Sequence, residues 1–169
     1  MEDNRMNLFG STPAELFEKL SKIASGRGVK LLLLTGSSNG KADFVGSCLE
    51  GRQMATVKLS SELSSRLASV GVDMIALETG DYLGDLHEEG PVLIDDIEML
   101  FDSGMGIDVL KLLKASARTR LLCVNWPGEL DVSSGCLYYA RGDVQEKSYP
   151  LDSELIVLDE SGVIYPQNF

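Results

Sequence analysis

The stretch LLLLTGSSNGKADF, residues 31 to 44, carries most of the information about the fold. It begins inside an apolar run, Val29 to Leu34, whose length suggests a strand covered on both faces, as in a parallel sheet. After Gly40, apolar residues recur at helical spacing as far as Gly51. The stretch therefore predicts a strand, a loop and a helix. The loop is either a phosphate-binding loop or only a polar turn.

The loop matches the Walker A pattern G-x-x-x-x-G-K-[ST] only in part. Aligned on Gly40 and Lys41, the pattern places Thr35 where its first glycine belongs and Ala42 where its hydroxyl residue belongs. Backbone N–H groups from Gly36 to Lys41 would still form an anion cradle at the start of a helix. The predicted nucleotide-binding residues are Thr35, Gly36, Ser37, Ser38, Asn39, Gly40, Lys41 and Ala42.

Ala42 removes a side chain that normally takes part in nucleotide hydrolysis. A serine or threonine after the lysine is normally a direct Mg²⁺ ligand, and alanine has no oxygen to replace it. Ser37, Ser38 and Asp43 are the residues that could compensate. We therefore expect ATP and Mg²⁺ as ligands, with weak or absent hydrolysis.

A second apolar strand, Pro91 to Asp95, ends in two adjacent carboxylates, which is the Walker B form. The carboxyl ends of parallel strands meet the phosphate loop, so an acid there can hold Mg²⁺. Asp95 is the predicted metal residue, and Asp96 the predicted general base that orients a water molecule. The alternative is that Asp96 caps the next helix and Asp95 is a solvated strand end.

A third buried-looking strand, Leu121 to Asn125, ends in a side-chain amide. In ATPases with an extra strand between Walker A and Walker B, the strand after Walker B ends in a polar residue that senses the γ-phosphate. Asn125 is the predicted catalytic residue of this kind. The alternative is an ordinary asparagine at a strand end.

The alternation of strands and helices predicts an α/β fold. We expect one domain over residues 1–169: an N-terminal helix in residues 1–28, with a capping box from Thr12 to Glu15, and a core in residues 29–169. The expected architecture is a three-layer αβα sandwich of the P-loop NTPase type, with an ASCE or AAA-like core. Its sheet is mainly parallel, with a C-terminal edge hairpin and no lid domain. The remaining predicted strands are 54–59, 135–139 and 154–158, the helices are 61–70 and 107–117, and the irregular connections are 71–90 and 126–134.

Charge is unevenly distributed along the chain. The net charge of −11 arises in residues 67–110, which contain eleven acids and no lysine or arginine, whereas the rest has 15 basic and 15 acidic residues. Such an acidic segment repels a phosphate backbone, so direct DNA binding by this chain alone is not expected. A basic partner protein or a bound cation fits better. A solvated surface is the plainer interpretation.

No apolar run approaches the ~20 residues of a membrane span, and the start MEDNRMN is too polar for a signal peptide. We therefore expect a cytoplasmic protein. Cys48, Cys123 and Cys136 lack metal-ligand spacing and are expected to be buried free thiols. His87, the single histidine, is expected at the surface.

Three further residues have two interpretations each. Arg118 and Arg120 could act as arginine fingers in a homo-oligomer assembled edge to edge around nucleotide, or could be helix-end cations. Trp126 follows the predicted sensor and could cover the site or a partner, or pack at the strand end.

Beyond the Walker elements, three longer blocks resemble the BrxF family, the small P-loop-containing proteins of type 3 BREX bacteriophage-exclusion systems. The blocks are VKLSSELSSRL (57–67), IDDIEMLFDSGMGIDVLKLLKASARTRLLCVNWPGEL (94–130) and YYARGDVQEKSYPLDSELIVL (138–158). The likeness covers most of the chain. The family usually has the full G-x-x-x-x-G-K-[ST] loop, so Thr35 and Ala42 are departures from it.

The resemblance implies an accessory of a multi-protein phage-defence system. Its partners would be a DNA methyltransferase, a larger ATPase, a helicase and a phosphatase-like protein. Two functions follow as hypotheses. One is a nucleotide-binding accessory with a degenerate Walker A loop. The other is a nucleotide-free module with the same fold, whose acidic segment docks on basic surfaces of partner defence proteins.

Overall fold

The computed structural model describes residues 12–37, 39–86, 90–102, 106–141 and 144–166, without the side chains of Val72, Arg141 and residues 144–146. The predictions for Ser38 and His87 lie outside these residues, as do Glu88 and Glu89 of the acidic segment.

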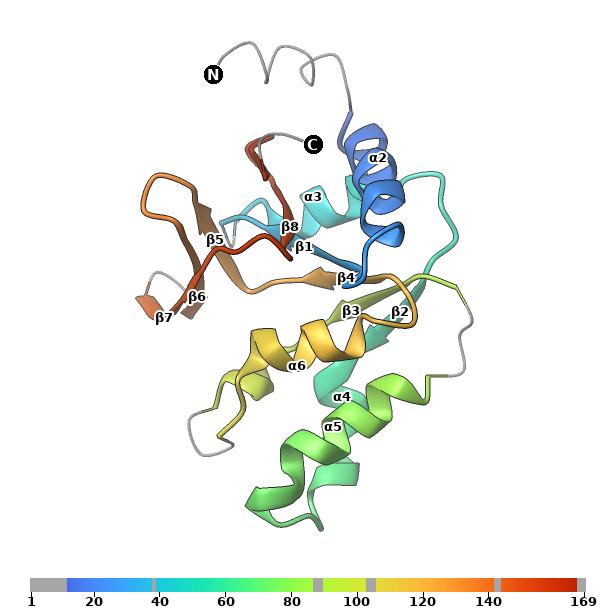
Figure 1. Cartoon of the computed structure of the whole chain (residues 1–169), viewed down its shortest axis with the longest axis vertical. Helices are drawn as coiled ribbons and strands as arrows, with labels where there is room; N and C mark the ends of the chain where they lie inside the picture. Colours follow the sequence, from blue (N-terminus) through green and yellow to red (C-terminus); the bar gives the residue numbers. More distant parts are fainter. Residues whose placement is uncertain (1–11, 38, 87–89, 103–105, 142–143, 167–169) are drawn as a thin grey trace.

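A six-stranded sheet forms the centre of the fold, in the order β2-β3-β4-β1-β8-β9 (Figure 1). Its strands are β1 (Leu31–Thr35), β2 (Ala55–Lys58), β3 (Val92–Asp95), β4 (Leu122–Asn125), β8 (Ile156–Asp159) and β9 (Ile164–Tyr165). All neighbours pair in parallel except β8 and β9, which form an antiparallel hairpin at the edge. An α/β fold with a mainly parallel sheet is thus confirmed, and so is the C-terminal edge hairpin.

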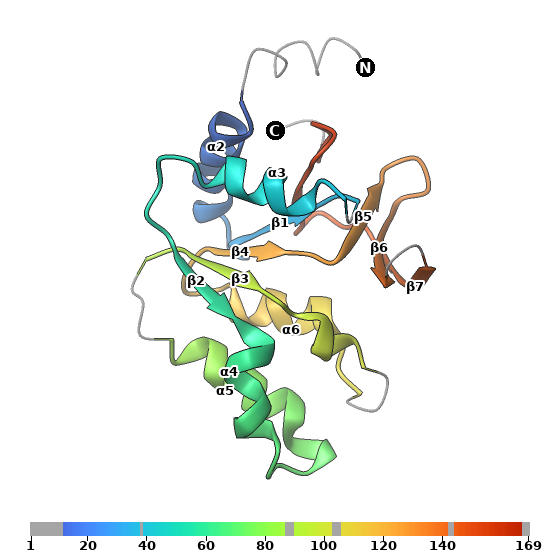
Figure 2. The same ribbon diagram turned by 180° about the vertical axis from the view of Figure 1, so that it is seen from behind.

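Helices cover both faces of the sheet (Figures 1 and 2). They are α2 (Pro13–Ser25), α3 (Lys41–Cys48), α4 (Leu59–Leu67), α5 (Ile75–Gly84) and α6 (Val109–Ser116). Leu32 and Leu34 of β1 belong to the apolar core shared with α2 and α3, whereas Leu31 and Leu33 belong to the core shared with α4, α5 and α6. All four leucines are completely buried. The predicted double-sided burial of this strand is therefore confirmed.

The N-terminal helix begins as predicted. The Thr12 hydroxyl accepts a hydrogen bond from the Glu15 N–H at 3.2 Å, and the Glu15 carboxylate accepts one from the Thr12 N–H at 2.8 Å. This capping box satisfies two donors that a helix start leaves unpaired.

The prediction of an irregular connection over 71–90 was wrong. This segment contains the 3-10 helix η1 (Val72–Met74) and all of α5. The buried side of α5 is made by Ile75, Thr79 and Leu83, four residues apart. Thr79 interrupts the apolar pattern, but its hydroxyl donates to the Ile75 carbonyl oxygen at 2.8 Å, which allows its burial.

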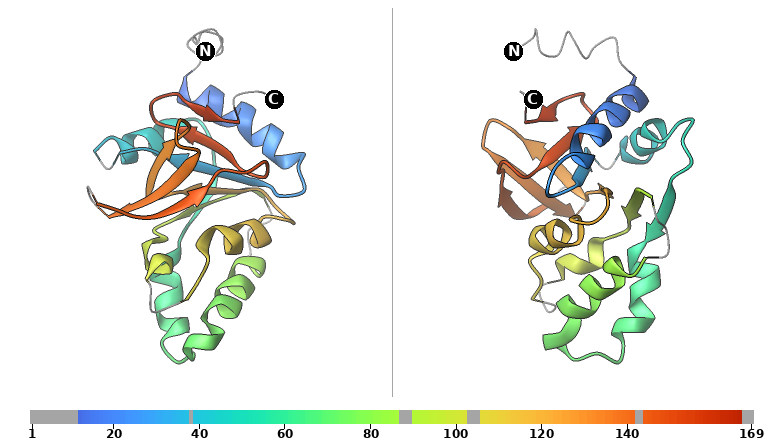
Figure 3. Two further views of the ribbon diagram at one scale, coloured as in Figure 1. Left: turned by 60° about the vertical axis from the view of Figure 1, so that its left-hand side comes forward. Right: turned by 45° about the vertical axis from the view of Figure 1, so that its right-hand side comes forward.

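The prediction of an irregular connection over 126–134 was also wrong, because a second sheet begins in this segment. Strands β5 (Gly128–Asp131), β6 (Cys136–Arg141) and β7 (Val144–Pro150) form an antiparallel sheet in the order β5-β6-β7. It stands beside the central sheet, on the side where β4 runs into β5 (Figure 3, left). The predicted strand 135–139 exists as β6, but it lies outside the parallel sheet.

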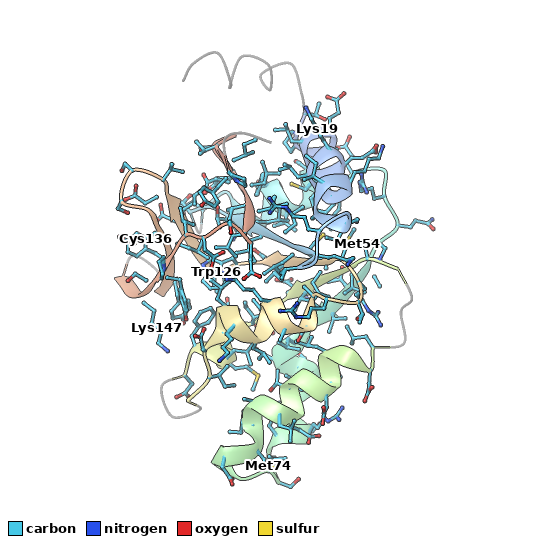
Figure 4. All side chains as sticks on the ribbon, viewed as in Figure 1. Lys19, Met54, Met74, Trp126, Cys136 and Lys147 are labelled. Carbon is cyan, nitrogen blue, oxygen red and sulfur yellow. The ribbon has the colours of Figure 1, made fainter. Side chains whose placement is uncertain are left out.

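An aromatic cluster joins the two sheets around Trp126, which lies between the small sheet and α6 (Figure 4). The Trp126 ring is completely buried and meets Phe101 and Tyr149 edge to face, while Phe101 stacks on Tyr139. The indole N–H donates to the Tyr138 carbonyl oxygen at 2.9 Å. Trp126 therefore packs in the core, as the plainer interpretation predicts.

Within the small sheet, Gly128 allows a close approach of β5 to β6. A methyl group at this position would overlap the carbonyl oxygen of Tyr138 and would lie 2.7 Å from its carbonyl carbon. Both are backbone atoms of the paired strand β6, so they cannot move aside without disturbing the sheet.

We expect Gly128→Ala to lower the free energy of unfolding by about 2 to 3 kcal/mol, because backbone overlap forces strain into a packed region. The matched control is Gly46→Ala in α3, where an added methyl group meets no atom within 4 Å. There alanine should raise the stability by about 0.5 to 1 kcal/mol. Equal unfolding midpoints of the two variants in urea would contradict this account.

Candidate functional site

Lys41 starts helix α3 at the carboxyl end of β1, where the loop leaves the sheet. Its side chain is only 8% exposed, and its ammonium group donates a hydrogen bond to the carbonyl oxygen of Trp126. The connection between β4 and β5 thus holds the lysine that the Walker A pattern provides.

Burial lowers the pKa of Lys41 to about 8, because a charged amine loses hydration there. Nearby carboxylates oppose this effect and favour the charged form: Asp159, Glu160, Glu98 and Asp95. The ammonium group is therefore surrounded mainly by negative charge.

Asp95 and Asn125 lie together, as the alignment of strand ends predicts. The Asn125 amide donates to the Asp95 carboxylate at 2.9 Å, and the same oxygen accepts the Asp96 N–H at 2.9 Å. Strand β4 lies between β1 and β3, so Asn125 stands between the loop and Asp95. Both side chains are half-buried.

Asp96 has a left-handed backbone conformation, with a φ of 58°. Its carbonyl oxygen accepts hydrogen bonds from the N–H and hydroxyl of Ser60, at 3.0 and 2.6 Å. The next helical turn, the 3-10 helix η2 (Glu98–Phe101), begins after Ile97, so Asp96 does not cap it. Glu98, and not Asp96, lines the cavity beside the loop.

That cavity has a volume of about 380 Å³, within the range of small-molecule sites in proteins. One wall is the loop, from Gly36 and Ser37 to Lys41 and Ala42, and the other is the start of the small sheet at Gly128 and Tyr139. Asn125, Glu98 and Glu129 also line it.

Thr35, the first departure from Walker A, is completely buried. Its hydroxyl donates to the Asp159 carboxylate at 2.7 Å, and its carbonyl oxygen accepts the Glu160 N–H at 2.9 Å. The threonine therefore attaches the loop to the turn between β8 and β9.

Glu160 enters the loop from this turn. Its carboxylate accepts hydrogen bonds from the Ser37 N–H and, at 2.8 Å, from the Ser37 hydroxyl. The Ser37 hydroxyl is thus engaged by a carboxylate, so it does not replace the oxygen missing at Ala42 in this arrangement. The Gly36 N–H is also in use, since it donates to the Gly128 carbonyl oxygen at 3.0 Å.

Glu160, Glu98 and the Trp126 carbonyl are site groups that sequence reasoning missed. Glu160 lies in a segment that reads as an ordinary hairpin turn, 123 residues from Ser37. The Trp126 carbonyl is a backbone group and has no sequence signal. Glu98 does have a sequence signal, because it is an acid two positions after Asp96.

Arg118 and Arg120 precede β4, at the strand end opposite to Asn125. Arg120 donates to the Leu86 carbonyl oxygen at 3.1 Å, and the carbonyl oxygen of Arg118 accepts from Lys30 at 3.2 Å. Neither lies at the loop of its own chain.

Comparisons with known proteins identify no relative by sequence. No family model matches the chain, and no curated protein matches it. A solved structure, "Structure of C. elegans PCH-2", matches 70% of this chain with 20% sequence identity and a TM-score of 0.38. The match spans 38% of that protein's chain. Similarity at this level supports no conclusion about fold or function.

Within the described residues, no three acidic, histidine or cysteine side chains form a group that could hold a metal ion. None of the helices in the same part of the chain has the length and apolar character needed to cross a membrane. Cys48 and Cys123 are buried free thiols, and burial raises the pKa of each to about 12, whereas Cys136 is half-buried.

Lys41 should make stability depend on pH. Between pH 8 and 10.5 the folded protein has lost this proton and the unfolded chain retains it, so unfolding takes up a proton and becomes less favourable as pH rises. Relative to Lys41→Met, the wild-type free energy of unfolding should increase by about 3 kcal/mol across this window.

The measurement is urea unfolding of both proteins from pH 7.5 to about 10.5. Cys48 and Cys123 oppose the trend above their unfolded pKa of 9, but they titrate in both proteins and cancel in the difference. A pH-independent difference would show that Lys41 is not buried as described.

Proposed function

We propose that the protein is a P-loop NTPase-like nucleotide-binding protein of the ASCE type, with weak or absent hydrolysis. The observation that carries the proposal is the meeting of three elements at one end of the sheet: the Gly40-Lys41 loop after β1, Asp95 at the end of β3 and Asn125 at the end of β4. The order β2-β3-β4-β1-β8 supports it, because β4, the strand that ends in Asn125, lies between the loop strand β1 and the Asp95 strand β3.

Each residue has a role that its position supports. Lys41 and the loop amides would bind phosphate oxygens at the start of α3. Asp95 would hold Mg²⁺ together with the nucleotide phosphates, since one carboxylate suffices when phosphates supply further oxygens. Asn125, hydrogen-bonded to Asp95 at 2.9 Å, would contact the terminal phosphate. The acids around Lys41 favour a nucleotide whose charge is reduced by Mg²⁺.

Our proposal that hydrolysis is weak or absent is supported by two features of the same site. Ala42 lines the cavity and offers no oxygen for the metal. Asp96, our candidate general base, is not among the cavity-lining residues. Glu98 does line the cavity and would be the alternative group to orient water.

The biological setting remains a proposal that rests on the BrxF resemblance. In it, the protein would serve as an accessory of a BREX phage-defence complex, beside the larger ATPase, the methyltransferase and the phosphatase-like protein.

Calorimetric titration with Mg-ATP tests nucleotide binding. Lys41→Met should weaken binding at least about tenfold, because a hydrogen bond from a charged donor contributes about 1.5 to 3 kcal/mol. Lys22→Met is the matched control, since this side chain on α2 is 80% exposed and is not among the residues that line the cavity. Ala42→Thr should strengthen binding by restoring the metal ligand. A lack of heat at millimolar Mg-ATP in the wild type and in every variant that keeps Lys41 would contradict the proposal.

A second candidate is a nucleotide-free interaction module, which two observations favour. Glu160 already fills hydrogen-bonding positions of the loop. In addition, α5 and the turn before it expose acidic residues, Asp73 and Asp81, beside two large apolar side chains, Met74 at 43% and Leu77 at 55% exposure. Met74, at the end of η1 just before α5, lies at the end of the molecule farthest from the central sheet (Figure 4).

The two candidates predict opposite mutant patterns in co-purification with partner defence proteins. If the acidic segment is the docking surface, Asp81→Lys with Asp85→Lys should abolish co-purification, because reversed charges repel a basic surface. Lys41→Met should then leave co-purification intact. Loss in Lys41→Met and retention in the double reversal would remove this candidate.

A further inference from the structure

The anion cradle of the loop already contains an anion from the same chain. The Glu160 carboxylate accepts hydrogen bonds from both the backbone N–H and the hydroxyl of Ser37. These are the donor types that phosphate-binding loops present to phosphate oxygens.

The two loop glycines show where the carboxylate lies. A methyl group at Gly36 would lie 2.6 Å from Oε1 of Glu160 and 2.7 Å from its Cδ and Cγ. At Gly40 the nearest atom to such a methyl group would be Oε2 of the same side chain. The carboxylate therefore fills the hollow between Gly36 and Gly40, and both glycines are needed for it to fit.

The turn between β8 and β9 holds Glu160 in this position. Asp159 accepts from Thr35 with one oxygen, at 2.7 Å, and from the Ser161 hydroxyl with the other, at 2.7 Å. The Gly162 N–H closes the turn on the Asp159 carbonyl oxygen at 2.9 Å, and the Glu160 N–H donates to the Thr35 carbonyl oxygen at 2.9 Å. A glycine at position 35 could not make the hydroxyl contact, so this departure from Walker A is part of the anchor.

A carboxylate and a phosphate cannot share this hollow. Both are anions that need the same N–H donor, and two like charges at contact distance repel each other. Glu160 also lies close enough to Lys41 to favour its charged form. The carboxylate thus supplies, within the chain, the negative charge that a phosphate would bring.

We propose that Glu160 is an internal competitor that closes the phosphate-binding loop until it is displaced. The inference rests on the proposed nucleotide site and adds its regulation: a nucleotide binds only when the Glu160 side chain leaves the cradle. If the closed form is about ten times more populated than the open one, the apparent affinity falls about tenfold.

The experiment compares the wild type with Glu160→Ala and Glu129→Ala, using Mg-ATP and inorganic tripolyphosphate in calorimetric titrations. Glu129 is the matched control, because it also lines the cavity and its loss changes the net charge equally. We expect Glu160→Ala to bind both probes at least about tenfold more tightly. Glu129→Ala should differ from the wild type by less than about threefold.

Thr35→Val is a second variant that keeps Glu160. Valine preserves the shape of threonine and removes the hydroxyl that holds Asp159, so the turn should loosen and affinity should rise by an intermediate factor. The Ser37 amide proton provides a readout without nucleotide. Its NMR signal should move upfield in Glu160→Ala, where the hydrogen bond to a carboxylate is lost, and stay in place in Glu129→Ala.

The outcomes separate this inference from the proposed function. Binding by Glu160→Ala with a weak or silent wild type supports both. Equal binding by the wild type and Glu160→Ala overturns the competitor role alone, and so does weaker binding by Glu160→Ala, which would make Glu160 a ligand of the bound complex. An equal rise in Glu160→Ala and Glu129→Ala overturns it too, since net charge would then explain the effect. Silence of every variant toward both probes overturns the nucleotide site, and the inference falls with it.

Discussion

The burial of strand β1 on both faces is the constraint on which the rest of the structure depends. Four consecutive leucines, completely buried, can be covered only if helices pack on both sides of the sheet and other strands flank β1. Parallel neighbours then end at the same edge. This requirement brings together the loop after β1, Asp95 at the end of β3 and Asn125 at the end of β4. The candidate site is thus a consequence of how the core is packed.

The loop region is held in place by polar contacts to chain segments that follow β4 and β8. Lys41 donates to the Trp126 carbonyl oxygen, and the Gly36 N–H donates to that of Gly128. On the other side, Thr35 and Ser37 bind Asp159 and Glu160. The loop therefore has well-defined partners within the chain, in contrast to a turn that is merely solvated. In the proposed nucleotide site, an incoming phosphate would have to replace one of these partners, and Glu160 is the one whose negative charge it shares.

Sequence reasoning succeeded where the signal is local. The capping box at Thr12, the strand over the leucine run and the meeting of Asp95 with Asn125 all follow from short patterns and from the geometry of parallel sheets. It failed where a long-range contact decides the outcome. Helix α5 was missed because Thr79 breaks its apolar face and becomes acceptable only by bonding Ile75. The small sheet was missed because the reason for a glycine at position 128, the close approach of the Tyr138 carbonyl group, is evident only once the two strands are paired. Glu160 was missed because only the fold brings it to Ser37.

The position of β8 has a consequence for the chain during synthesis. This strand is the fifth parallel strand of the sheet and covers one side of β1, yet it is formed by residues 156–159, near the end of the sequence. After β4 has been made and until those residues leave the ribosome, β1 can pair with β4 on one side but has an open row of N–H and C=O groups on the other. An unpaired edge that carries four leucines is a template for pairing with other chains. The interval before β8 is made is therefore the period in which this protein is most exposed to aggregation, and in which a chaperone would protect it most.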